Sequence, residues 1–477
     1  MLREITALGS KLALGIAAAL LSALAPAQAG LTISSNPTQN VSCDAAAHCS
    51  ATAPSAAMNV HELKKLLASQ PRVVLDAATA KDIDLDAPVG WTSSSSLSLM
   101  ARGSVLVHKS LTVAGPGGLR VKGELLLAPG TGVSFWDLSS SLNLNGNAYQ
   151  LVGSLSSLNN AIKSNSAGYY ALANDYDASV DGVYANTPIE GDFTGVFEGL
   201  GHTISHVAIY AYGPGSAFLG LFSVNHGTIA DINLTGAKYR NGVRFDAGIL
   251  AGDNYGTIRN ASVDGSVRNV EGALAVGGLV GGNAGIISAS RSVAQIEGDQ
   301  SAVFAVGGLV GSNSGTIEES YAEGSVSMAP PNSPSGPGGL AGVSGGVIKN
   351  CYSLAHVHGV TGYYGGLIGG AGAGSVAASY AAGQIEKANH SGGMPGGVTG
   401  YQPLRRIEKY SDTYWDVDDG VRDPSAAIAS VPNDQGVTGL TTLQLQSALP
   451  AGFDSHVWSQ NPSINNGLPY LLRNPPR

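Results

Sequence analysis

The chain has 477 residues, of which 66 are glycine and only 12% are charged, and its formal net charge is −9. Soluble proteins usually contain about 25% charged residues, and this chain has no block of lysine and arginine. The composition therefore excludes a basic nucleic-acid-binding protein. With 4 tryptophans and 8 phenylalanines, the chain favours a thin interior made of small aliphatic side chains.

The start of the chain, residues 1–29, has the pattern of a secretory signal peptide. Arg3 and Lys11 give a positively charged start, residues 12–24 are apolar, and residues 27–29 (Ala-Gln-Ala) form a small-x-small cleavage site. The apolar run is shorter than the ~20 residues that a membrane-spanning helix needs, and no later segment is apolar enough to cross a membrane. We therefore expect removal of residues 1–29 and an exported protein that is secreted, held at the cell surface or left in the periplasm.

Residues 30–72 are predicted to be a loose lead-in followed by a short capping helix. The part up to residue 57 shows no period, whereas apolar side chains recur at helical spacing over 59–69. Asn59 is a suitable N-cap for this helix, and Pro71 ends it. Cys43 and Cys49 lie close together, and an exported compartment favours a disulfide between them; the sequence leaves open whether they are bonded.

Short apolar runs separated by Gly and Pro predict irregular β-solenoid coils over residues 73–210. A second short helix is expected at 154–162. The predicted strands of this region are 73–75, 97–99, 105–107, 111–113, 119–121 and 125–127.

Over residues 211–400, a short apolar motif of Gly and Leu recurs at a nearly constant interval. We call this four-residue motif the knot; examples are residues 278–281 and 308–311. A period in the range of about 20–50 residues is typical of a stacked solenoid, in which each unit buries its apolar face against its neighbours. Glycine is too frequent for helices, where each costs about 0.5–1 kcal/mol relative to alanine. Each repeat is therefore predicted to be one coil of short parallel strands. A degenerate seventh repeat is expected at 397–400. The knot leucines of the six regular repeats are Leu221, Leu250, Leu279, Leu309, Leu340 and Leu367.

Other positions recur with the leucines and predict columns of stacked side chains. An isoleucine follows the leucine at the same spacing in five units, and Val376 takes its place in the sixth. The asparagines that follow the first four knots are expected to form a ladder of amide hydrogen bonds: Asn225, Asn254, Asn283 and Asn313. Tyr321, Tyr352 and Tyr380 are expected to stack in the same way. We interpret these columns as packing; a ligand platform is the alternative.

Residues 401–477 break the repeat and are predicted to be a C-terminal capping module, because a terminal coil must not leave an exposed strand edge. Irregular loops interrupt the repeats at 213–216, 329–337 and 388–395. Since binding residues often lie on loops carried by a rigid scaffold, we expect these loops to carry any binding specificity.

The knots, most of them followed by Asn-x-Gly-x-Ile, resemble the repeats of bacterial surface proteins with GLUG motifs. Residues 170–204, which include Gly199-x-Gly201-His202-Thr203-Ile204, look like the module that usually precedes these motifs, and the stretch from Tyr414 to Trp458 looks like the module that follows them. Residues 59–150 are similar to the coils of filamentous-haemagglutinin-type adhesins. The resemblance covers about residues 59–475. It implies an all-β fold, a single right-handed parallel β-helix, and a role in adhesion or surface contact without shared catalytic residues.

A polysaccharide-degrading β-helix enzyme is the alternative function. Such enzymes need two or more carboxylates that converge on one face, whereas the carboxylates of the regular coils fall in different columns: Asp231, Asp253, Asp264, Glu297, Glu318, Glu319 and Glu323. Two further clusters could bind Ca²⁺ but are interpreted as turn formers: Asp175, Asp177 and Asp181, and Asp416, Asp418 and Asp419. His202 is interpreted as a structural hydrogen-bonding residue, with a general base as the alternative, and Cys351 as a small packed residue.

The sequence thus predicts an exported, non-enzymatic, adhesin-like β-solenoid with a short N-terminal helix and a C-terminal capping segment. Its expected partner is a surface receptor or a glycan, and neither nucleic acid nor a membrane-spanning segment is expected. No catalytic, cofactor-binding or metal-binding residue is predicted.

Cleavage of the signal peptide can be tested directly. N-terminal sequencing and intact mass of the protein from its producing cells should show a chain that begins at Gly30. Fractionation of the same cells locates the product. A mature chain that still begins with Met1 would contradict the prediction.

Overall fold

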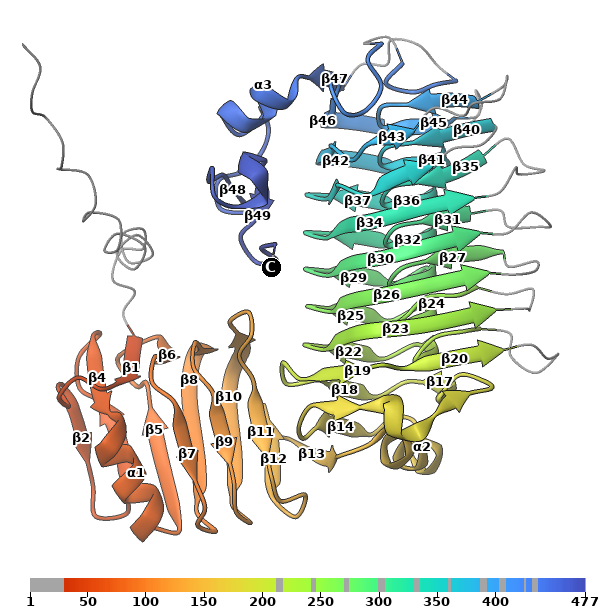
Figure 1. Cartoon of the computed structure of the whole chain (residues 1–477). Coiled ribbons are helices and arrows are strands. Elements are labelled where there is room, and N and C mark those ends of the chain that lie inside the picture. The colour runs from red at the N-terminus through yellow and green to blue at the C-terminus, as the bar shows by residue number, and fades with distance from the viewer. Residues whose placement is uncertain are drawn as a thin grey trace, which may run out of the picture.

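The computed structural model describes residues 30–211, 218–241, 246–269, 274–298, 305–328, 335–358, 362–386, 393–402, 409–423, 426–430 and 436–476. These residues form two stacks of parallel β-coils that run crosswise to one another (Figure 1). The predicted parallel β-solenoid is confirmed. The coils divide into two stacks at residues 147–152, a change of direction that the sequence did not predict.

The first stack is built from β1 to β12. Parallel pairing joins β5, β8, β10 and β12 in one sheet and β7, β9 and β11 in another. The strands predicted at 97–99 and 105–107 are one long strand, β8, which pairs with β10 along its length. The strands are β1 (Gly30–Ser34), β2 (Val41–Cys43), β3 (His48–Ala51), β4 (Ala56–Asn59), β5 (Arg72–Asp76), β6 (Asp82–Leu85), β7 (Val89–Trp91), β8 (Ser96–Val107), β9 (Leu111–Val113), β10 (Gly118–Leu127), β11 (Val133–Phe135) and β12 (Ser141–Leu144).

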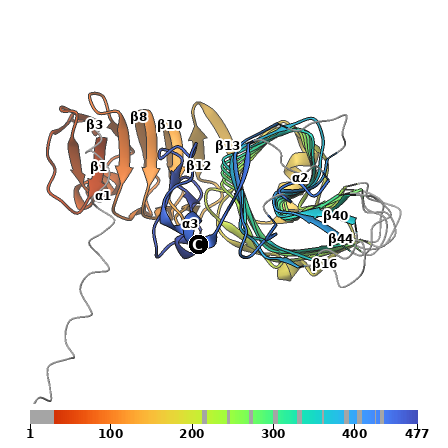
Figure 2. The ribbon, with the colours of Figure 1, turned by 90° about the horizontal axis from the view of Figure 1, so that it is seen from above.

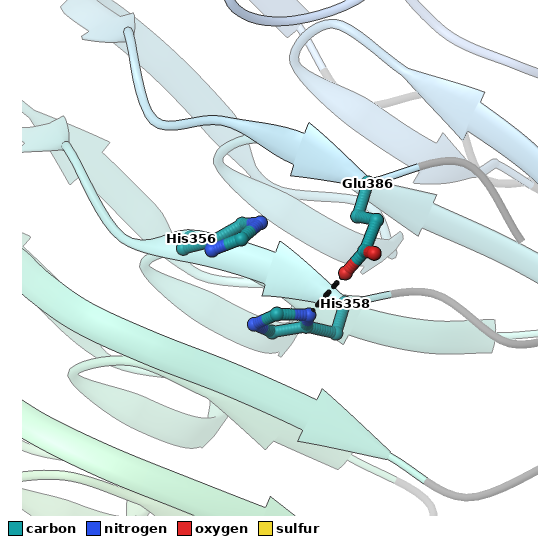
Figure 3. A group of neighbouring side chains, drawn as sticks. All are labelled: His356, His358 and Glu386. Atoms are coloured by element: carbon teal, nitrogen blue, oxygen red, sulfur yellow. Dashed lines mark hydrogen bonds and ion pairs between the residues drawn. The ribbon is translucent and has the colours of Figure 1, made fainter.

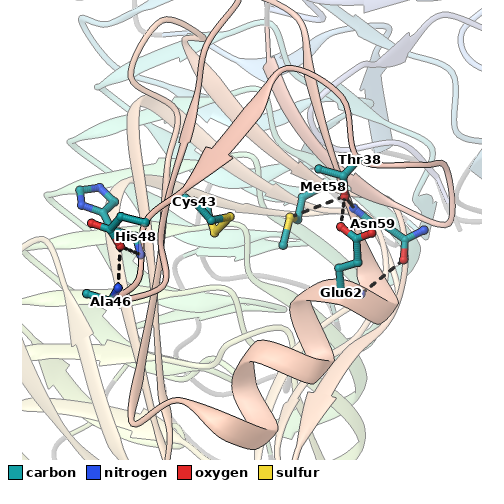
Figure 4. Close-up of a disulfide and its surroundings, with 9 residues drawn as sticks. Thr38, Cys43, Ala46, His48, Met58, Asn59 and Glu62 are labelled. Atoms are coloured by element: carbon teal, nitrogen blue, oxygen red, sulfur yellow. Dashed lines mark hydrogen bonds between the residues drawn. A yellow bond between two sulfur atoms is a disulfide. The ribbon is translucent and has the colours of Figure 1, made fainter.

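Residues 30–57 are largely ordered strands, not the loose lead-in that the sequence predicted. Leu31 and Ile33 are fully buried, and β1 pairs in parallel with both β4 and β6. An alternation of only two apolar residues was too short to be recognised as a strand. Cys43 and Cys49 face each other in the β2–β3 hairpin and form a disulfide (Figure 4), which decides the pairing that the sequence left open.

Two short helices lie at the ends of the stacks. In α1 (Val60–Ser69), the Asn59 side chain accepts hydrogen bonds from the first-turn backbone, which confirms the predicted N-cap. Leu63 and Leu67 of this helix join the core of the first stack. The second helix, α2 (Leu155–Ser164), covers the start of the second stack with its buried face (Figures 1 and 2).

The direction of stacking changes at β13 (Asn147–Val152). This strand pairs antiparallel with β12 and parallel with β14, the first strand of the second stack. Asn145 and Gly146 form the turn between β12 and β13, both with positive φ. Such a two-residue turn is typical of a hairpin, and it prevents the first stack from continuing in parallel.

The second stack has three sheets whose coils superimpose when viewed along the stack (Figure 2). The long sheet contains β14 (Tyr169–Leu172), β15 (Tyr176–Asp177), β16 (Val183–Tyr184), β18 (Val196–Glu198), β19 (Thr203–Ser205), β20 (Ala208–Ala211), β22 (Thr228–Ala230), β23 (Asn233–Asn241), β25 (Thr257–Arg259), β26 (Ser262–Asn269), β29 (Ile286–Ser288), β30 (Arg291–Gly298), β33 (Thr316–Glu318), β34 (Tyr321–Met328), β37 (Val347–Lys349), β38 (Tyr352–Ser353), β39 (His356–His358), β42 (Ser375–Ala381), β43 (Ile385–Glu386), β46 (Lys409–Asp416) and β47 (Val437–Leu440).

The other two sheets of this stack are shorter. The second sheet contains β17 (Ile189–Phe193), β21 (Phe222–Asn225), β24 (Ala251–Asn254), β28 (Val280–Asn283), β32 (Val310–Asn313), β36 (Ala341–Ser344), β41 (Ile368–Ala371) and β45 (Thr399–Tyr401). The third sheet contains β27 (Ala275–Gly277), β31 (Ala305–Gly307), β35 (Ser335–Gly338), β40 (Gly362–Gly365) and β44 (Gly393–Gly396).

The predicted columns are present in the second stack. All six knot leucines and the isoleucine column, with Val376, are fully buried. The Asn column forms the expected ladder: each Nδ2 donates to the next Oδ1 at 2.7, 2.7 and 2.8 Å. In the first repeat, Gly236 adds one residue to β23, so that Tyr239 takes the buried position that Val267 holds in the next coil.

Glycine allows the third sheet to lie directly against the second. A Cβ added to Gly281, Gly311 or Gly342 would lie only 2.3 to 2.5 Å from a backbone nitrogen of the facing strand. On that facing strand, a Cβ on Gly307 would lie 2.1 Å from the oxygen of Val310. No side chain fits between these backbones, so the close approach requires glycine at the knots.

Ser290, Ser320, Cys351 and Ser379 occupy the same position in successive coils, and hydrogen bonds link this column from coil to coil. The hydroxyl oxygen of Ser320 accepts a hydrogen bond from the backbone nitrogen of Ser290, and that of Ser379 accepts one from Cys351. Burial raises the pKa of the Cys351 thiol to about 12, so the thiol is inert at neutral pH. The residue before this column adopts positive φ in successive coils: Asp231, Asn260, Ala289, Glu319, Asn350 and Ala378.

The segment after β47 folds back along the side of the second stack (Figure 1). It contains α3 (Thr442–Ser447), β48 (Trp458–Ser459) and β49 (Tyr470–Leu471). Trp458 packs against the stacked rings of Tyr352 and Tyr380, and the Tyr380 hydroxyl donates to the carbonyl of Pro469 at 2.7 Å. The tyrosine column therefore binds the chain's own C-terminal segment and is not an exposed ligand platform.

The glycine contact gives a prediction about stability. Gly311→Ala should destabilise the protein by about 1–3 kcal/mol, because the new Cβ would press against the nitrogen of Val276 and force the two sheets apart. Denaturant unfolding measures the change. Gly345→Ala is the matched control, since its Cβ would meet its nearest neighbours at 3.9 Å. Equal stability of the two variants would contradict the proposed contact.

Candidate functional site

The long sheet presents a polar outer face built from two columns of side chains. Tyr239, Val267, Ile296, Val326 and Val357 point inward from successive strands and are at most 1% exposed. The residues on either side of them point outward, in register from coil to coil. We call these the polar columns; one contains Lys238, Ser266, Gln295, Ser325 and His356, and the other contains Tyr210, Arg240, Arg268, Glu297, Ser327, His358 and Glu386.

Cationic side chains gather at one end of the polar columns, around a hollow of about 190 Å³. The Arg240 guanidinium lies 5.6 Å from the centre of the Tyr210 ring. Arg268 is paired with Glu297 at 3.1 Å, whereas neither Lys238 nor Arg240 forms an ion pair within the described ranges. This end of the columns can therefore accept an anionic group, next to an aromatic ring that suits a sugar.

At the other end of the polar columns lie two histidines and a glutamate. His356 and His358 belong to β39, and Glu386 follows on β43. Their side chains are close enough to hold a metal ion together. The polar columns thus offer a cationic hollow at one end and possible metal ligands at the other.

Two carboxylates lie next to each other where the second and third sheets meet. Asp246 and Asp253 are hydrogen-bonded to each other, and burial, followed by the neighbouring Asp253, raises the pKa of Asp246 to about 7. The Tyr255 hydroxyl donates to Asp253 at 3.2 Å, and the His226 ring stacks on the Tyr255 ring. A substantial fraction of Asp246 is therefore still protonated near neutral pH, which a general acid requires.

This pair corrects one conclusion from the sequence. Asp253 was placed alone in its column, and Asp246 was not considered. The two residues are brought together because the chain folds tightly at the Gly248 knot, where a Cβ would lie 2.4 Å from the Cα of Val280.

The two predicted aspartate clusters act mainly as turn formers. Asp416 is 1% exposed and accepts hydrogen bonds from the backbone of Asp418 and from the Thr442 hydroxyl. Asp177 accepts a bond from the backbone of Ser179. Asp181 accepts bonds from two tyrosine hydroxyls. Their oxygens are occupied by protein donors, which fits the interpretation from the sequence.

His202 connects the two stacks. Its Nδ1 lies 3.1 Å from Asp175 and its Nε2 lies 2.9 Å from the backbone oxygen of Val133, at the end of the first stack. Both ring nitrogens are engaged with the protein and the ring is buried. This geometry fits the structural role expected for His202.

A charged network is buried near the junction of the stacks. Arg259 pairs with Asp231 at 2.6 Å and with Glu198 at 3.1 Å. Burial, together with nearby Asp231, raises the pKa of Glu198 well above its usual value. Arg259 and Asp231 also line a hollow of about 310 Å³ whose wall includes residues of the first stack and of the C-terminal segment. The three charged residues of the network belong to the second stack, and two of them, Asp231 and Arg259, form one side of this hollow.

The loops that were expected to carry specificity fall largely outside the described residues. This holds for 213–216, for 329–334 and for 388–392, whereas 335–337 belong to β35 and 393–395 to β44. The residues that the sequence analysis missed are Lys238, Arg240, Asp246, His356, His358 and Glu386. A signal for two of them was available: His356 and His358 flank Val357, which recurs in the sequence with Val267, Ile296 and Val326 at one spacing after the knot leucines.

The GLUG motif matches residues 302–327, whose described part, 305–327, lies within one coil of the second stack. The predicted GLUG motif is confirmed there. A comparison with curated proteins finds no match. Among solved structures, the chain is similar to the crystal structure of a putative immunoglobulin A1 protease from Bacteroides ovatus, with 21% identity and a TM-score of 0.42; the match covers 64% of this chain and 86% of that one.

Among the described helices, none combines the length and the apolar character that crossing a membrane requires.

The Asp246–Asp253 pair gives a prediction about pH. The folded protein holds the Asp246 proton up to about pH 7, because burial raises its pKa, whereas an unfolded chain releases it near the ordinary pKa of 3.8. Between these values the folded state binds more protons, so the free energy of unfolding falls as the pH rises. Asp246→Asn removes this contribution. Its melting temperature relative to wild type should therefore increase from pH 4 to pH 8.

The matched control is Asp264→Asn, which changes an exposed aspartate in the next coil. Its melting temperature should follow that of the wild type across the same pH range. If Asp246→Asn behaves in the same way as this control, the raised pKa of Asp246 is refuted.

Proposed function

We propose that the protein is exported and acts as a non-enzymatic, adhesin-like binding protein that takes an anionic glycan on the polar columns. The observation that carries this proposal is the hollow lined by Tyr210, Lys238, Arg240 and Arg268. The GLUG motif and the signal-like segment 1–29 support a protein of the bacterial surface or exterior.

Charge argues for an anionic ligand at this hollow. The chain as a whole has a net charge of −9, yet three cationic side chains and only one carboxylate, Glu297, line this small hollow. Two of them, Lys238 and Arg240, are exposed and have no carboxylate partner in the described part of the chain. Such a local concentration of one charge attracts a ligand of the opposite charge.

The remaining lining favours a sugar. Ser266 and Gln295 can form hydrogen bonds with hydroxyl groups, and the Tyr210 ring can pack against the apolar face of a sugar ring. Because all these residues lie on paired strands, their spacing is fixed before the ligand arrives, which reduces the entropic cost of binding.

An enzyme that degrades polysaccharides is the second candidate. The Asp246–Asp253 pair favours it, since a protonated carboxyl next to an ionised one can act as acid and base. We keep the binding protein as the proposal, because binding of an anionic ligand alone accounts for the cationic hollow, without a catalytic step.

The test measures binding and turnover in parallel. The purified protein is titrated with pectate, alginate and heparin, with neutral dextran for comparison, at low and high salt. We expect binding to at least one anionic polymer, weakening with salt as charges are screened. Lys238→Ala/Arg240→Ala should reduce the affinity by at least about tenfold, since hydrogen bonds to charged groups contribute about 1.5–3 kcal/mol each.

Arg120→Ala/Lys122→Ala is the matched control, because it removes two exposed cations from the first stack. This control should bind like the wild type. Equal losses in both double variants would refute a specific site on the polar columns. If the wild type releases reducing ends or unsaturated uronates from these polymers, and Asp253→Asn abolishes this release, the proposal of a binding protein is wrong and the enzyme is supported.

A further inference from the structure

His356, His358 and Glu386 come together through the regular geometry of the coils. His356 and His358 are alternate residues of β39, so both point outward while Val357 between them is fully buried. Glu386 stands directly opposite His358 on the neighbouring strand β43. Figure 3 shows the two imidazole rings on one strand and the carboxylate reaching down from the next.

The ligand atoms of the three side chains converge. One ligand atom from each lies within 4.8 Å of the others. The centres of the two imidazole rings are 3.9 Å apart, and His358 Nδ1 is hydrogen-bonded to Glu386 Oε2. In a tetrahedral site with bonds of about 2.0 Å, neighbouring ligand atoms lie about 3.3 Å apart, so small side-chain rotations are sufficient.

One atom in this group lacks a partner that a metal would supply. His356 Nε2 is buried and accepts or donates no hydrogen bond among the described residues. A buried polar atom without a partner costs about 1–3 kcal/mol, and such atoms in folded proteins call for an explanation. A simple ion pair between His358 and Glu386 would leave this nitrogen unexplained.

The strand that precedes the two histidines carries small side chains next to them. In the preceding strand β34, the residues opposite the two histidines are Ser325 and Ser327, which are small. Two imidazole nitrogens and one carboxylate oxygen are donors that suit Zn²⁺ and related divalent transition metals. Three protein ligands leave a fourth position for water or for a donor from outside.

We infer that His356, His358 and Glu386 form a binding site for a divalent transition-metal ion, Zn²⁺ in the first place, that bridges the coils of β39 and β43. The ion replaces the contact between His358 and Glu386 with two metal bonds and gives the buried His356 nitrogen a partner. The paired strands fix the backbone of all three ligands. The site does not depend on the proposed glycan binding, because it lies at the opposite end of the polar columns.

The test uses the full chain without a polyhistidine tag, treated with a chelator and then dialysed. Titration with Zn²⁺ by calorimetry should show one site of micromolar affinity or better. His358→Asn should weaken this affinity at least tenfold, and His356→Asn likewise. The matched control is His456→Asn, which removes an exposed histidine that also lies next to a carboxylate, Asp454; it should bind like the wild type.

Two further measurements separate loss of metal binding from loss of folding. Circular dichroism and the melting temperature without metal should be alike in all variants, because the replaced side chains are partly exposed. The visible spectrum of the Co²⁺-loaded protein should show four-coordinate ligation in the wild type and lose it in His356→Asn/His358→Asn. Absence of a Zn²⁺ site in the wild type, or equal binding by this double variant, would overturn the inference.

Discussion

The contact of backbone on backbone at the glycine knots is the constraint on which the second stack depends. Two layers of strands approach so closely at Gly281, Gly311 and Gly342 that no side chain can stand between them. This contact holds the second and third sheets together at each knot, and the knot leucine beside it is fully buried. Because the same contact recurs in each repeat, successive coils have the same path and stack in register.

Fixed register explains both the columns inside the stack and the sites on its surface. Inside, identical side chains meet, so that four asparagines form a hydrogen-bonded ladder and tyrosines form a stack. Outside, packing does not require identical residues, and the polar columns vary from coil to coil. A few substitutions in such columns are enough to assemble a cationic hollow or a group of metal ligands on a scaffold that is already rigid.

The C-terminal segment covers one surface of the second stack. The tyrosine column projects from the long sheet, and residues after β47 cover it with Phe453 and Trp458. Asn474 reaches back along the stack as far as the carbonyl of Ser290. Asn474 also contacts the carbonyl of Glu319, so the C-terminal segment ties neighbouring coils together, and it leaves the polar columns uncovered.

The sequence by itself determined the repeat, the buried leucine and isoleucine columns, the asparagine ladder and the two helix starts, because each depends on local spacing and on the identity of residues one coil apart. Tertiary structure alone decided where the chain turns at β13, where the C-terminal segment lies, and which polar residues meet. Asp246 and Asp253 meet only because the knot folds two sheets together. His358 and Glu386 come from separate coils and meet because β39 and β43 pair in parallel. Their spacing from the knot leucines differs by one residue, so the sequence repeat does not reveal this register.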